Sequence, residues 1–221
     1  MDPMRGRLIH LKERGFDPKC IVDVGAYRGE WADLASVLFP KADLYLFEAN
    51  KQHEPILKNK GYDYSITLLG EEDGQVVNFY SSSSTEQQTG NSIFIENTNF
   101  YAEENLESEQ MTAATLDRIL SEKKAPTVDF IKLDVQGAEL IVLDGAKETL
   151  KGVEAVLLEA SILEYNKDAP TFEEIIRYMG DAEFRVYDVL GMHYLPAKLL
   201  SQMDILFIRK NSSLFPKGLL Y

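Results

Sequence analysis

The stretch Cys20-Ile21-Val22-Asp23-Val24-Gly25-Ala26-Tyr27-Arg28-Gly29 decides the fold of this chain. Its apolar first half is typical of a buried strand, and a glycine turn then leads into an amphipathic helix predicted over 30–39. A second apolar run, 44–47, ends in Glu48. Strand, glycine turn, helix, strand and acid in this order are typical of a doubly wound sheet that holds a nucleoside, whose ribose hydroxyls donate hydrogen bonds to the acid.

The remaining sequence alternates predicted strands and helices. Further strands are predicted over 64–69, 76–80, 129–135, 153–159, 184–189 and 205–209, and further helices over 8–14, 55–59, 115–120, 139–150 and 172–179. Residues 191–203 are predicted to connect the last two strands. This alternation predicts an α/β fold with a mostly parallel sheet and helices on both faces. It also predicts a single domain over 1–221 that begins with a helical segment, 1–19.

A polar insertion over 81–110 interrupts this alternation. Serine, glutamine and asparagine are frequent in it, and few apolar residues anchor it. An insertion of this length in a compact domain is typical of a functional loop or of a mobile one, and both interpretations stay open. We expect it near the active-site edge of the sheet.

Charge and cysteine content narrow the classes of partner. The formal net charge is −13 at pH 7, and such an acidic surface repels phosphate backbones and anionic lipids. We therefore expect no nucleic-acid partner. We also expect no membrane insertion, because no apolar run approaches the ~18 residues of a membrane-spanning helix. The single cysteine, Cys20, cannot form an internal disulfide, which fits a reducing compartment, and a cytoplasmic location is expected.

The glycine turn argues against a dinucleotide cofactor. Gly25 and Gly29 have the spacing G-x-x-x-G, whereas the dinucleotide fingerprint is G-x-G-x-x-G. Tyr27 stands where the second glycine of that fingerprint makes room for a pyrophosphate. A nicotinamide-dependent oxidoreductase is therefore a disfavoured alternative, and a nucleoside cofactor without a phosphate at that place is favoured.

A second acidic strand end lies further along the chain. The apolar run 129–133 leads to Asp134, and Gly137 then turns the chain into a helix. Asp134 is predicted beside the first turn if this strand is the fourth of the sheet, at the edge where ligands bind. An acid in this place either caps the helix or meets the reacting groups, and the two roles are compatible.

Several of these stretches together resemble a known family. They read I-V-D-V-G-A-Y-R-G, L-F-E-A-N, T-L-D-R-I-L, D-F-I-K-L-D-V-Q-G-A-E-L-I-V-L-D-G-A and V-L-L-E-A, in this order, over most of 20–160. They are similar to the FkbM family of S-adenosylmethionine-dependent methyltransferases, and the D-x-x-G-A-E block is the most specific. The resemblance implies a class I methyltransferase fold with strand order 3-2-1-4-5-7-6, an antiparallel last strand and S-adenosylmethionine as cofactor.

The same resemblance implies roles for individual residues. The residues implied to bind the cofactor are Asp23, Gly25, Ala26, Tyr27 and Gly29 at its methionine half, Glu48 and Ala49 at the ribose, Gly70 and Glu71 beside the adenine, and Asp134 near the sulfonium. Two positions depart from the family pattern. Tyr27 stands where the family commonly has Asn, and Gln136 stands where it commonly has Glu. The second exchange removes a charge that could help to hold a metal, and no metal is expected.

Methyl transfer to a hydroxyl also requires a group that takes the hydroxyl proton. Three residues predicted at the carboxyl edge of the sheet are candidates: Asp134, Glu159 and His193, the last in the predicted 191–203 connection. The resemblance implies that the acceptor is a hydroxylated small molecule, a sugar or a glycan. We expect Tyr165, Asn166 and residues 81–100 to form the wall around it. A non-catalytic binding module remains the alternative. The apolar tail 214–221 suggests a homodimer.

Overall fold

The computed structural model describes residues 3–83, 90–196 and 198–216. Part of the polar insertion, 84–89, and part of the apolar tail, 217–221, lie outside these ranges. Within them, seven strands form one large sheet. In spatial order they are β3 (Asp63–Ile66), β2 (Asp43–Glu48), β1 (Cys20–Val24), β7 (Phe130–Leu133), β8 (Ala155–Ser161), β10 (Leu200–Arg209) and β9 (Phe184–Tyr194). Numbered along the chain within this sheet, the order is 3-2-1-4-5-7-6, and the last strand, β10, runs antiparallel to both neighbours, which confirms the prediction.

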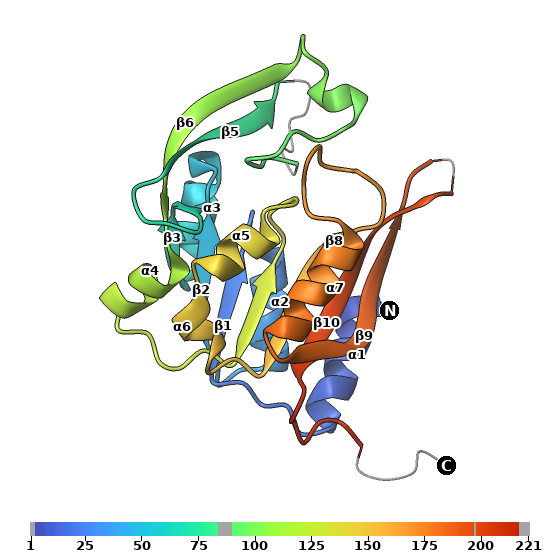
Figure 1. Ribbon diagram of the computed structural model, residues 1–221. Coiled ribbons are helices and arrows are strands. Elements are labelled where there is room, and N and C mark those ends of the chain that lie inside the picture. Colours follow the sequence, from blue (N-terminus) through green and yellow to red (C-terminus); the bar gives the residue numbers. More distant parts are fainter. Residues whose placement is uncertain (1–2, 84–89, 197, 217–221) are drawn as a thin grey trace.

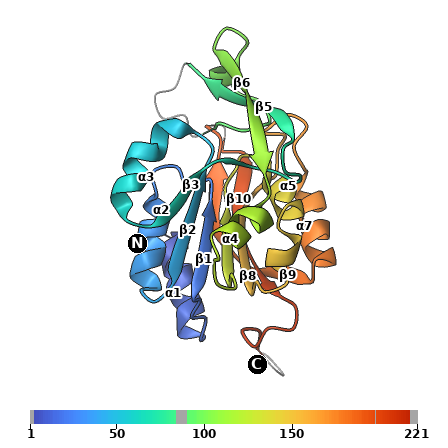
Figure 2. The same cartoon turned by 90° about the vertical axis from the view of Figure 1, so that its left-hand side faces the viewer.

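Helices cover both faces of the large sheet (Figures 1 and 2). One layer holds α1 (Pro3–Glu13), α2 (Glu30–Leu38) and α3 (Glu54–Lys60), and the other holds α4 (Leu116–Glu122), α5 (Glu139–Asp144), α6 (Lys147–Leu150) and α7 (Phe172–Asp181). Side chains alternate along β1, so Ile21 packs in the first layer's core while Val22 and Val24 pack in the second. Strands buried on both faces read as continuous apolar runs, which is why they were recognisable in the sequence.

A second, three-stranded sheet lies beyond the carboxyl ends of the large one (Figure 1). It consists of β4 (Leu68–Leu69), β6 (Leu106–Ala114) and β5 (Val76–Ser82), in this spatial order. The first part of β6, residues 106–110, was expected to belong to the polar insertion 81–110. Its residues are mostly exposed up to Thr112, and only Ala113 and Ala114 are buried, so the exposed part has no buried face to impose an apolar alternation.

Two further expectations about local structure were wrong. The predicted helix 139–150 is divided into α5 and α6 at Gly145 and Ala146. A Cβ atom at Gly145 would lie 2.0 Å from the Gly70 carbonyl oxygen, so this junction requires a glycine. The predicted connection 191–203 is mostly strand, because β9 and β10 continue their pairing to Tyr194 and Leu200. None of the helices in the described ranges has the length and apolar character needed to cross a membrane.

Candidate functional site

A cavity of about 300 Å³ lies between the carboxyl ends of the large sheet and the small sheet. This volume is at the lower end for sites that bind small molecules. Its wall on the side of β1, β2 and β7 includes Gly25, Tyr27, Glu48, Ala49, Leu69 and Asp134. The wall on the side of β8 and the loops above includes Asn91, Ser92, Glu96, Gln136, Tyr165 and Gln202. The predicted ribose acid and the predicted reaction-centre acid therefore share one cavity.

Glu48 is held rigidly at the end of β2. The Tyr27 N–H donates to its Oε2 at 2.7 Å, and the Asn50 N–H donates to its Oε1 at 2.8 Å. Burial raises the pKa of Glu48, and the two backbone N–H groups act in the opposite direction because they stabilise the anion. Each carboxylate oxygen has a second lone pair, so Glu48 can still accept hydrogen bonds from two hydroxyl groups of a ligand.

Gly25 is required for a reason that the sequence did not reveal. A Cβ atom at this position would lie 1.9 Å from the Asp134 carbonyl oxygen, and the φ angle is 70°. The first turn thus packs directly on the backbone that follows β7. The missing side chain of Gly25 thus makes room for the main-chain carbonyl group of Asp134.

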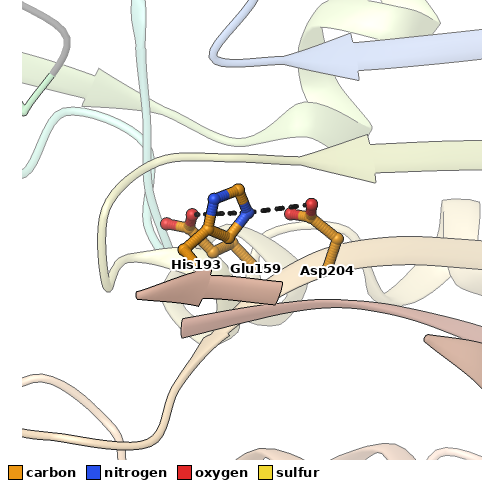
Figure 3. Close-up of side chains that lie close together, drawn as sticks. All are labelled: Glu159, His193 and Asp204. Atoms are coloured by element: carbon orange, nitrogen blue, oxygen red, sulfur yellow. Dashed lines mark hydrogen bonds and ion pairs between the residues drawn. The ribbon is translucent and has the colours of Figure 1, made fainter. Parts of the chain in front are cut away.

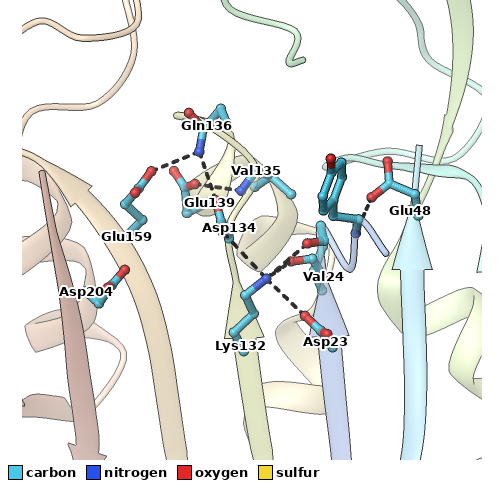
Figure 4. Close-up of polar contacts among 12 residues, drawn as sticks. Asp23, Val24, Glu48, Lys132, Asp134, Val135, Gln136, Glu139, Glu159 and Asp204 are labelled. Atoms are coloured by element: carbon cyan, nitrogen blue, oxygen red, sulfur yellow. Dashed lines mark hydrogen bonds and ion pairs between the residues drawn. The ribbon is translucent and has the colours of Figure 1, made fainter. Parts of the chain in front are cut away.

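A buried ion pair lies beneath this turn. Lys132 Nζ is 3.0 Å from Asp23 Oδ1 and donates to the Gly25 carbonyl at 3.0 Å (Figure 4). Asp23 and Lys132 are cross-strand partners in the parallel β1–β7 register, so their side chains project to the same face. Burial raises the pKa of Asp23, while Lys132 opposes this rise. Burial alone would lower the pKa of Lys132, but Asp23 and Asp134 raise it to about 12, so the lysine is charged.

Other residues that the resemblance assigned to the cofactor lie beside the cavity. Ala26 is buried, and its N–H donates to the Phe47 carbonyl at 3.0 Å. Gly29 caps α2 with φ 77°. Gly70 and Glu71 line a separate, smaller hollow. Asp23 acts through Lys132 on the backbone of the turn.

On the other side of the cavity, one amide joins two acids. Gln136 Nε2 donates to Asp134 Oδ1 at 2.9 Å and to Glu159 Oε2 at 3.0 Å (Figure 4). Gln202 Nε2 donates to the same Glu159 oxygen at 2.6 Å. Burial, and then the charge of Asp134, raises the pKa of Glu159 well above its usual value. A glutamate at 136 could not donate both hydrogen bonds, so this departure from the family pattern has a structural role here.

His193 belongs to β9 and faces two carboxylates. Its Nε2 is 3.0 Å from Asp204 Oδ2 and 4.0 Å from Glu159 Oε1 (Figure 3). The hydrogen bond with Asp204 is the main cause that raises the pKa of His193. Asp204 was missed by sequence reasoning, because it lies inside a long strand rather than at a recognisable motif. Asp134 lines the cavity, whereas Glu159 and His193 do not belong to its wall, and Glu159 reaches that wall through Gln136 and Gln202.

The loops over the cavity contribute further polar groups. Ser92 Oγ donates to the Val135 carbonyl at 3.0 Å, and Tyr101 OH donates to Asn91 Oδ1 at 3.1 Å. Glu96, which sequence reasoning also missed, is buried and accepts from Thr98 Oγ1 at 2.6 Å. Tyr165 lines the cavity as expected for a wall residue. The described part of the insertion therefore closes over the site.

Comparison with known families places these features in context. Residues 23–186 match the family model described as the methyltransferase FkbM domain. No curated protein sequence matches the chain.

Two solved structures illustrate the similarity of fold. The precorrin-6y C5,15-methyltransferase from Geobacter metallireducens is 14% identical, with a TM-score of 0.50 over 94% of this chain and 87% of that one. TrmK from M. capricolum, solved with S-adenosyl-homocysteine, is 9% identical, with a TM-score of 0.50 over 93% of this chain and 68% of that one. At these identities the likeness concerns the fold alone.

Proposed function

The chain belongs to the FkbM family of S-adenosylmethionine-dependent methyltransferases, and from this premise we propose that it methylates a hydroxyl oxygen of a small molecule, a sugar or a glycan. The observation that carries the proposal is the amide and hydroxyl lining of the cavity on the side of β8. Its members are Asn91, Ser92, Gln136, Tyr165 and Gln202. Side chains of these kinds donate to and accept from the hydroxyl groups of a neutral acceptor.

The cofactor would occupy the side of the cavity that faces β1 and β2. Glu48 would accept from the two ribose hydroxyls, and the adenine would lie against Phe47 and Leu69, which line that wall. The methionine half would follow the turn at Gly25 towards Asp134. A carboxylate there would stabilise the positive sulfonium by electrostatic attraction.

In this arrangement Asp134 is the proposed general base. Methyl transfer mainly requires that acceptor oxygen, methyl carbon and sulfur are aligned and shielded from water. Asp134 lines the cavity, and Gln136 orients its carboxylate through the 2.9 Å hydrogen bond. As the oxygen attacks the methyl carbon and the carbon–sulfur bond breaks, the hydroxyl proton would pass to Asp134, which leaves S-adenosylhomocysteine and the methyl ether.

Calorimetric titration with S-adenosylhomocysteine tests the cofactor half of this proposal. We expect micromolar binding to the wild type and binding at least tenfold weaker in Glu48→Ala, equivalent to about 1.4 kcal/mol. Glu54→Ala is the matched control, because Glu54 is a nearby exposed glutamate on α3. Equal affinity in all three proteins would contradict the ribose assignment, and binding of NADH instead would favour an oxidoreductase.

Release of S-adenosylhomocysteine in the presence of candidate acceptors tests the other half. We expect turnover with polyhydroxylated acceptors and at least a hundredfold loss in Asp134→Asn, since general-base catalysis contributes about 10²–10⁴-fold. Tight cofactor binding without turnover on any acceptor would favour the non-catalytic binding module. The cytoplasmic location, the single-domain organisation and the homodimer stay predictions.

A further inference from the structure

We propose that Glu159, His193 and Asp204 form a binding site for a divalent cation of the first transition row. The three side chains come from β8, β9 and β10 and point towards one another (Figure 3). Glu159 is connected with the wall of the cavity through its hydrogen bonds with Gln136 and Gln202. The affinity of this site for metal is independent of the proposed function. Its use in methyl transfer rests on that function.

The donor atoms already have nearly the spacing that a metal requires. His193 Nε2 lies 3.0 Å from Asp204 Oδ2 and 4.0 Å from Glu159 Oε1, and one donor atom from each residue lies within 4.8 Å of the others. Ligand bonds of about 2.0–2.2 Å place the donor atoms of one ion about 3–4 Å apart. Small side-chain rotations would therefore bring all three atoms onto one ion.

The arrangement of charge favours a cation between these groups. Asp204 is the direct cross-strand partner of Glu159 in the antiparallel β8–β10 pairing, and like charges in directly opposite positions destabilise a sheet. Asp134 and Glu139 add negative charge near Glu159. Lys132 Nζ lies 3.0 Å from Asp23 Oδ1 and 3.7 Å from Asp134 Oδ2, so it offsets part of the charge of Asp134, while its ion pairs do not include Glu159 or Asp204. A dication bound by neutral His193 would balance the charges of the two opposed carboxylates.

Two further features hold the carboxylates in place. Gln136 and Gln202 both donate to Oε2 of Glu159, which leaves Oε1 directed at His193. Hydrogen bonds of this kind orient the ligands of protein metal sites. At Gly191, the β9 partner of Asp204, a Cβ atom would lie 2.0 Å from Asp204 Oδ2. The missing side chain thus makes room for the carboxylate that contacts His193.

The donor set and its exposure indicate which ions bind. One imidazole and two carboxylates suit Mn²⁺, Fe²⁺ or Zn²⁺ better than Ca²⁺ or Mg²⁺, which prefer oxygen ligands alone. The His193 side chain is 48% exposed, whereas those of Glu159 and Asp204 are 11% and 17% exposed. The ion would therefore reach the site from solvent and keep open positions for water or for oxygens of the acceptor.

Titration with Mn²⁺, followed by electron paramagnetic resonance of the free ion, tests the site on the full chain after treatment with a chelator. We expect one Mn²⁺ per chain with micromolar affinity, weakened at least tenfold in His193→Ala and in Asp204→Asn. Asp188→Asn is the matched control, because it removes a carboxylate from the same strand, β9, outside the cluster. Unchanged circular dichroism and S-adenosylhomocysteine binding would show that the variants fold.

Two results would overturn the site: Mn²⁺ and Zn²⁺ that stay free in the presence of wild type, or binding that persists in both cluster variants. Methyl transfer that is insensitive to EDTA, with a pH profile shifted by Asp204→Asn, would overturn the use of the ion in methyl transfer and would assign the His193–Asp204 pair to proton transfer. Specific Mn²⁺ binding without methyl transfer on any acceptor would support the site while the proposed function fails. The two proposals are thus separable.

Discussion

Two regions beside the cavity differ in how their buried carboxylates are balanced by positive charge. Beneath the turn that follows β1, the buried carboxylate of Asp23 has a matched cation, Lys132 on β7, at 3.0 Å. Between β8, β9 and β10, the two carboxylates of Glu159 and Asp204 face one histidine. A matched ion pair needs no further ligand in the folded chain. Two carboxylates that face each other repel, and a bound proton or cation reduces this repulsion. The contrast indicates that the Asp23–Lys132 pair stabilises the fold, whereas the cluster of Glu159, His193 and Asp204 is suited to binding a proton or a cation.

The largest expected effect comes from breaking the matched pair. Lys132→Met leaves Asp23 buried without its cation, and we expect a loss of about 3–5 kcal/mol in the free energy of unfolding. Urea denaturation measures it. Lys123→Met, which removes a partly exposed lysine paired with Asp63, is the control and should cost below about 1 kcal/mol. Similar losses in both variants would show that the buried pair has no special role.

Gly25→Ala tests the close contact between the first turn and the backbone of Asp134. The added Cβ would meet the Asp134 carbonyl at 1.9 Å and would also occupy a left-handed conformation, so we expect a loss of about 3 kcal/mol. Gly74→Ala separates the two causes, because Gly74 has φ 83° and open space around it. Backbone strain alone should cost that variant about 1–2 kcal/mol. Thermal unfolding of both proteins measures the difference, and equal losses would refute the clash.

Glu139 provides a test through pH. Burial raises its pKa to about 7, above the value of 4.5 for a free glutamate, so the folded chain binds this proton more tightly than the unfolded chain. Its stabilising contribution is therefore present below about pH 4.5 and is lost as the pH rises to 7. Relative to Glu139→Gln, we expect the wild type to lose about 2 kcal/mol between pH 5 and 7.

Urea denaturation of both proteins at several pH values measures this loss. Glu148→Gln, at an exposed glutamate of α6, should show a constant difference from the wild type. A constant difference for Glu139→Gln as well would mean that Glu139 is not responsible.

The smallest effect concerns the bridge between the acids. Gln136→Glu removes the donor shared by Asp134 and Glu159 and adds a like charge beside them, so the already raised pKa of Glu159 should rise further. We expect the acidic limb of the methyl-transfer pH profile to move up by about one unit, equivalent to about 1.4 kcal/mol. S-adenosylhomocysteine affinity should change less than threefold. A profile that stays in place would show that the amide does not control the acids.

Local motifs and long-range contacts were predictable to different degrees. The turn at Gly25, the acid Glu48 and the sheet were readable because buried parallel strands leave continuous apolar runs and strand-end signals. Lys132 was missed because it lies within an apolar run, and only the strand register shows that it opposes Asp23. Asp204 is likewise defined by its partners on β8 and β9. The exposed strand β6 left no periodic pattern to detect.

Glu48 shows a consequence of being held by two backbone groups. Because the Tyr27 and Asn50 N–H groups fix both of its oxygens, the side chain has lost its rotational freedom during folding. A nucleoside that binds there meets an acceptor that is already ordered, and it avoids an entropic cost of about 0.5–1.5 kcal/mol for immobilising such a side chain. The conformational entropy of the Glu48 side chain is thus lost when the chain folds and not when the nucleoside binds.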